Sequence, residues 1–79
     1  MKTYTTRIQL EQEEDGRWGA WAPDLPGCAT WGYTQEEALH NIHEAVRGYI
    51  QTLVKNGLPI PPGVKATDEP EVSVVVSAA

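Results

Sequence analysis

The chain has 79 residues, 41% of them hydrophobic, with 6 lysines and arginines against 11 aspartates and glutamates and a formal charge of -5. This length is about half of the ~150 residues of a common domain, so residues 1–79 are expected to form a single domain. One cysteine cannot form an internal disulfide, which excludes a disulfide-stapled secreted scaffold.

Charge and hydropathy also restrict the partners and the compartment. Six cations dispersed among eleven carboxylates give no footprint for phosphates, so direct nucleic-acid binding is not expected. An acidic surface instead suits a basic protein partner, although it also serves solubility. The N-terminus does not have the pattern of a signal peptide, and no run approaches the ~20 apolar residues of a spanning helix. We therefore expect a cytoplasmic protein that does not bind membranes.

Short strands are expected in the first part of the chain. Polar and apolar residues alternate from the N-terminus, which is typical of a strand covered on one face. Asp15-Gly16 then predicts a hairpin turn, and Pro26-Gly27 fits the centre of a type II turn. A valine-rich segment near the C-terminus predicts a last strand that is buried or paired. The expected strands cover residues 3–12, 17–22, 28–33 and 71–77.

A long helix is expected over residues 35–56. Thr34 and Glu37 have the spacing of a capping box, and a broad apolar stripe follows at helical spacing. Gly57 suits the left-handed position that ends a helix. After a proline-rich connector, residues 64–70 are expected to be a polar loop.

This order of elements predicts an α+β fold with the helix on one face of the sheet. A three-stranded antiparallel meander leads into the helix, whose right-handed crossover brings the fourth strand beside the first and parallel to it, in the spatial order 3-2-1-4. Such a sheet has unpaired edges and an uncovered second face, and a domain of this size has little stability to spare. Self-association through these surfaces is therefore expected.

The residues that could perform chemistry do not form a convincing active site. His40 and His43 lie three residues apart on the helix, but no further metal ligands accompany them, so a solvated helix face is favoured over a metal site. Cys28 follows a turn into an apolar strand, where an inert buried thiol is favoured over a nucleophile. Carboxylates are spread over loop and helix, so a two-metal nuclease site is not expected. We expect neither enzymatic activity nor a cofactor or metal.

Aromatic residues are the remaining notable group. Trp18 is expected in the core. For Trp21, Trp31 and Tyr33 the choice between core and interface stays open, because the register of the second and third strands is not fixed by the sequence.

Several motifs together resemble the HicB antitoxin family, and the resemblance covers nearly the whole chain. They are Asp15-Gly16-Arg17-Trp18, Pro23-Asp24-Leu25-Pro26-Gly27-Cys28, Gly32-Tyr33-Thr34-Gln35-Glu36-Glu37-Ala38 and Leu58-Pro59-Ile60-Pro61.

The resemblance implies a partial RNase H-like fold without nuclease activity, and formation of homodimers or homotetramers. It also implies binding of a small basic ribonuclease toxin, HicA, whose active site the domain would block. Two features depart from the family pattern. Tyr33 stands where an aspartate is common, and the sequence does not continue into the operator-binding module of many HicB proteins.

The leading hypothesis is a non-enzymatic, antitoxin-like domain that sequesters a HicA-type ribonuclease toxin. The alternative is an oligomeric structural or regulatory module with no toxin partner. The residues expected to contact a partner combine exposed aromatic groups with carboxylates that steer a basic protein. They are Trp21, Asp24, Trp31, Tyr33, Glu36, Glu37 and Glu44.

Overall fold

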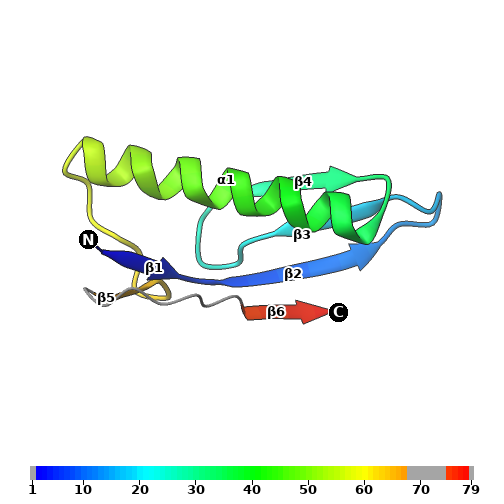
Figure 1. The fold of residues 1–79 in the computed structure, drawn as a ribbon, viewed down its shortest axis with the longest axis horizontal. Coiled ribbons are helices and arrows are strands. Elements are labelled where there is room, and N and C mark those ends of the chain that lie inside the picture. The colour runs from blue at the N-terminus through cyan, green and yellow to red at the C-terminus, as the bar shows by residue number, and fades with distance from the viewer. Residues whose placement is uncertain (1, 68–74, 79) are drawn as a thin grey trace.

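The computed structural model describes residues 2–67 and 75–78 of the chain (Figure 1). Its elements follow the order strand, strand, strand, strand, helix, strand, strand. They are β1 (Thr3–Thr5), β2 (Arg7–Gln12), β3 (Trp18–Trp21), β4 (Ala29–Gly32), α1 (Gln35–Lys55), β5 (Lys65–Thr67) and β6 (Val75–Ala78).

The main sheet has four strands in the order β4-β3-β2-β6. Strands β2, β3 and β4 form an antiparallel meander, and β6 pairs with β2 in parallel, with Arg7 opposite Val75. Helix α1 lies along one side of the sheet (Figure 1). The predicted α+β class is confirmed. The described part of the last strand, β6, pairs in parallel with β2, and residues 71–74 of the predicted strand 71–77 lie outside the described residues.

The predicted first strand, residues 3–12, is interrupted at Thr6. Its first part, β1, runs in line with β2 but pairs antiparallel with β5 in a separate two-stranded sheet. The prediction of a continuous polar loop over residues 64–70 is therefore wrong for Lys65–Thr67. A strand of three residues with two of them exposed has no apolar alternation that the sequence could reveal.

The core lies between α1 and the main sheet. Because alternate residues of a strand point to opposite faces, Leu10 and its register partner Ala20 lie on the same face, and both are buried. The helix contributes residues at helical spacing to the same cluster. The buried apolar residues are Ile8, Leu10, Ala20, Ala22, Leu25, Cys28, Ala38, Ile42, Ile50 and Val64.

Two glycines adopt the positive φ angles that their predicted turns require. Gly16 (φ 90°) closes the β2–β3 hairpin, in which the Glu13 N–H donates to the Arg17 carbonyl at 2.7 Å. Gly27 (φ 79°) follows Pro26 in the β3–β4 connection, and the Cys28 N–H donates to the Leu25 carbonyl at 3.0 Å.

The ends of α1 agree with the predicted bounds to within one residue. At its start, the Thr34 hydroxyl accepts from the Glu37 N–H at 3.0 Å, while the Glu37 carboxylate accepts from the Tyr33 N–H, one residue before the position in a standard capping box. At its end, Gly57 has φ 66° and the Leu58 N–H donates to the Leu53 carbonyl, which forms a Schellman motif. Within the described residues, no helix is both long enough and apolar enough to span a bilayer.

Candidate protein-binding surface

One face of the main sheet is not covered by the helix. The strand register places Glu11 opposite Gly19, and Gly19 opposite Trp31, so these three residues form a row across β2, β3 and β4. This row alternates with the buried row of Leu10 and Ala20 and therefore lies on the other face. Over the described residues no helix lies on this face, which makes it the candidate surface for contact with a partner.

Two aromatic side chains are exposed at the end of β4. Trp31 is 46% exposed and Tyr33 is 69% exposed. Their rings meet edge to face, with centroids 5.0 Å apart and planes at 86°. Trp21 is half-buried, and Trp18 is half-buried against the core, in agreement with the expectation for Trp18. Exposure thus distinguishes Trp31 and Tyr33 from Trp18 and Trp21.

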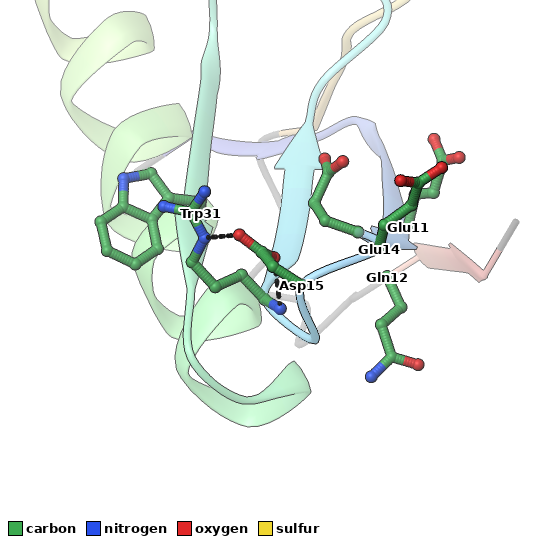
Figure 2. A pocket seen from close by; sticks show the side chains of 7 residues that line it. Glu11, Gln12, Glu14, Asp15 and Trp31 are labelled. Carbon is green, nitrogen blue, oxygen red and sulfur yellow. Dashed lines mark hydrogen bonds and ion pairs between the residues drawn. The ribbon is translucent and has the colours of Figure 1, made fainter.

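An ion pair within the β2–β3 hairpin lies beside Trp31, and its cation is the Arg17 guanidinium (Figure 2). Arg17 Nε lies 2.7 Å from Asp15 Oδ2, and the Arg17 backbone N–H donates to Asp15 Oδ1 at 3.0 Å. This backbone hydrogen bond, with the side-chain ion pair, lowers the pKa of Asp15 below its usual value. The Arg17 guanidinium carbon lies 5.2 Å from the Trp31 ring centroid, within the range of a cation–π contact.

Several carboxylates line the same surface hollow as this ion pair. The hollow is lined by Glu11, Gln12, Glu13, Glu14, Asp15, Arg17 and Trp31, so that four carboxylates and one guanidinium belong to its lining (Figure 2). We call this hollow together with Tyr33 the acidic–aromatic surface. Sequence reasoning missed its hairpin residues, although the run from Glu11 to Asp15 is the densest acidic stretch of the chain. Its contact with Trp31 depends on strand register, which the sequence does not fix.

The structure places the predicted partner-binding residues in different regions. Trp31, Tyr33 and Glu37 are close together, since Glu37 Oε1 accepts from the Tyr33 N–H at 3.0 Å. Glu36 is exposed beside Glu37 in the first turn of α1.

Two of the predicted carboxylates lie elsewhere. Asp24 belongs to the β3–β4 connection, where its Oδ2 lies 3.4 Å from Arg7 Nε and its side chain is 23% exposed. A Cβ atom at Gly63 would overlap the Asp24 carboxylate, so Asp24 also packs against the segment after the helix. Glu44 lines a second, more apolar hollow beside α1, together with Gly48 and Leu53.

The chemistry-bearing residues outside this surface are dispersed. Cys28 is buried, and its burial raises the pKa of the thiol, which disfavours the thiolate needed for nucleophilic attack. His40 and His43 are exposed on α1. Over residues 2–67 and 75–78, no group of three or more histidine, cysteine, aspartate or glutamate side chains is arranged to hold a metal ion.

Comparison with known proteins identifies the family. The family model described as "HicB_like antitoxin of bacterial toxin-antitoxin system" matches residues 6–74. A UPF0150 protein of Thermoplasma acidophilum is 48% identical over 54 residues, which cover 68% of this chain and 78% of that protein. A UPF0150 protein of Synechocystis is 43% identical over 58 residues, which cover 73% of each chain.

A solved structure shares the fold. The N-terminal domain of Burkholderia pseudomallei antitoxin HicB superposes with a TM-score of 0.62 at 23% identity, covering 85% of this chain and 93% of that chain. Because the family model matches most of the sequence, the chain belongs to the HicB-like antitoxin family of bacterial toxin–antitoxin systems.

Proposed function

We propose that this chain is a non-enzymatic antitoxin that sequesters a small basic ribonuclease toxin of the HicA type and blocks access to its active site. Membership of the HicB-like antitoxin family supports the antitoxin role. We infer that the β4-β3-β2-β6 sheet with α1 on one face corresponds to a partial RNase H-like fold. In this proposal the domain acts by covering its partner's surface.

The observation that carries the proposal is the exposed Trp31–Tyr33 pair at the rim of an acidic hollow on the uncovered face of the sheet. Aromatic anchors supply much of the binding energy in protein interfaces. Carboxylates around them attract a basic protein and orient it during encounter. Together they provide both an anchor and a means of steering, which a protein that masks a cationic ribonuclease needs.

The other predicted contacts extend this surface. Glu36 and Glu37 lie next to Tyr33 at the start of α1 and would enlarge the acidic rim. We assign Trp21, Asp24 and Glu44 to the edge of the partner contact, since Asp24 is already paired with Arg7 and Glu44 lines a separate hollow. We also propose that the antitoxin is a homodimer or homotetramer and that it assembles with its partner in the cytoplasm. It does so without contacting a membrane or binding nucleic acid directly.

The test is capture of the toxin. The gene next to the one for this chain should encode a small basic protein that copurifies with it and whose ribonuclease activity it suppresses in a stoichiometric manner. If no such neighbour exists and the purified chain protects RNA from no HicA-type ribonuclease, the antitoxin role is wrong. A chain that self-associates but captures no toxin would instead support an oligomeric structural or regulatory module.

A further inference from the structure

We propose that the Trp31 ring is a cation-exchange site, at which an arginine or lysine side chain of the basic partner replaces the chain's own Arg17. The inference rests on the proposed function for the nature of the partner and adds the atoms that would recognise it. In the free protein, Arg17 occupies the site as an internal substitute for the partner's cation.

The geometry of Arg17 shows that the ring can accept a guanidinium. The Arg17 guanidinium carbon lies 5.2 Å from the centroid of Trp31 while this indole is still 46% exposed. The Tyr33 ring meets the indole edge to face, with the two ring centroids 5.0 Å apart, and this limits the orientations that the indole can adopt. A partner side chain would therefore meet a ring that is already oriented, and this reduces the ordering cost of binding.

Arg17 can leave the ring without losing its counter-ion. Its Nε lies 2.7 Å from Asp15 Oδ2, and both residues belong to the same hairpin. We infer that a displaced Arg17 stays beside Asp15, so that the main cost of the exchange is the contact with Trp31. For an exposed cation–π pair this contact corresponds to about a two- to fivefold change in an equilibrium constant.

Charge complementarity favours a basic protein segment as the occupant. Glu11, Glu13 and Glu14 line the same hollow as Trp31, in addition to the Asp15–Arg17 pair. Their charges attract a lysine- or arginine-rich segment and repel the phosphates of a nucleic acid. The incoming cation gains these carboxylates as neighbours together with the ring.

The exchange can be tested with a nona-arginine peptide as the probe, with affinities measured by calorimetry and tryptophan fluorescence. Arg17→Gln removes the internal cation, and Arg47→Gln removes the same charge from an exposed position on α1. We expect Arg17→Gln to bind the peptide about two- to fivefold more tightly than Arg47→Gln does. Trp31→Leu should weaken binding, and in its background the advantage of Arg17→Gln should disappear.

Three results would show that no cation exchange takes place at Trp31. Equal affinities of the two arginine variants, unchanged binding by Trp31→Leu, or no binding of the peptide would overturn the inference. Circular dichroism shows whether each variant is folded, and the exposure of Trp31 makes loss of folding unexpected. If the toxin is captured but the Trp31 cycle shows no coupling, the exchange site is wrong and the antitoxin role stands. If the coupling is present but no toxin is captured, the antitoxin role is wrong.

Discussion

Gly32 and Gly48 differ in what surrounds the missing side chain. A Cβ atom at Gly32 would overlap backbone atoms of Glu37 and Ala38 in α1, whereas one at Gly48 would meet nothing within 4 Å. We predict that Gly32→Ala lowers the free energy of unfolding by about 1–3 kcal/mol, because helix and strand must move apart. Gly48→Ala should raise it by about 1 kcal/mol, because alanine is the better helix former.

Urea unfolding followed by circular dichroism measures both glycine variants under the same conditions. Each replacement adds the same methyl group, so each serves as the matched control for the other. A stable Gly32→Ala variant would show that α1 does not pack against β4 as closely as described. A destabilised Gly48→Ala variant would mean that other atoms occupy the space beside Gly48, such as those of a second copy of the chain.

Cys28 makes stability depend on pH in the alkaline range. Burial raises the pKa of its thiol above the usual value of 9.0, so the folded state retains the proton where the unfolded state loses it. This contribution is fully present below the unfolded pKa and is lost as the pH rises through the folded pKa. We predict that the wild-type chain loses more stability above about pH 9 than Cys28→Ala does, in urea titrations at several pH values.

Thiol reactivity gives an independent measurement of the same burial. Iodoacetamide should modify Cys28 slowly in the native protein and rapidly in urea, because the buried thiol is protonated and shielded. Rapid modification of the native chain, or identical alkaline pH profiles for the two proteins, would contradict the burial of this side chain.

At the scale of the element, the start of α1 couples helix stability to the aromatic pair. The Glu37 carboxylate accepts from the Tyr33 N–H, whereas Glu36, its exposed neighbour, has the same charge in the same helical turn. We predict that Glu37→Ala lowers the free energy of unfolding by about 0.5–1.5 kcal/mol more than Glu36→Ala does. Thermal or urea unfolding checks this difference.

Binding measurements on Glu36 and Glu37 variants must separate direct contact with the partner from a change in the position of Tyr33. If Glu37→Ala weakens toxin binding more than Glu36→Ala does, part of the loss comes from the altered position of Tyr33. Equal stability of the two variants would show that the hydrogen bond to the Tyr33 N–H contributes nothing measurable. The binding difference would then report direct contact with the partner.

The elements that the sequence predicts are those whose signals are local. The helix has its own cap at Thr34, its own stop at Gly57 and a long apolar stripe, and its bounds agree with the prediction to one residue. By contrast, β1 and β5 pair segments as far apart in the sequence as Thr5 and Lys65, a separation over which residue pattern carries no signal.

The central register pair of these two strands, Tyr4 and Ala66, is 62 positions apart in the sequence, and the pair with the shortest separation, Thr5 and Lys65, is 60 positions apart. Pairing at such separation depends on where the whole chain places the two segments, and three-residue strands are too short to show a period of two. The candidate surface follows the same rule. Trp31 could be named from its residue type, but its contact with Arg17 arises from the β3–β4 register.

For the whole molecule, the uneven placement of charge matters more than the net charge of -5. Four carboxylates line the hollow beside Trp31, whereas Glu44 lies in a separate hollow beside α1. Complementary charge acts mainly on the rate of association, while a desolvated aromatic anchor acts mainly on the rate of dissociation. If the chain captures a basic toxin as proposed, the acidic rim and the ring should therefore have separable kinetic effects on this capture.

We predict that Glu14→Gln slows association with the toxin and makes the rate less dependent on salt, whereas Glu44→Gln, with the same change of charge, has a smaller effect. Trp31→Leu should leave association nearly unchanged and accelerate dissociation. For the wild-type chain, the association rate should fall roughly tenfold or more at high salt, because the screening length shrinks from about 10 Å at 0.1 M to about 3 Å at 1 M. Surface plasmon resonance at several salt concentrations measures both rates. Equal effects of Glu14→Gln and Glu44→Gln would show that the toxin responds to net charge alone, and the acidic–aromatic surface would then lose its role as the docking site.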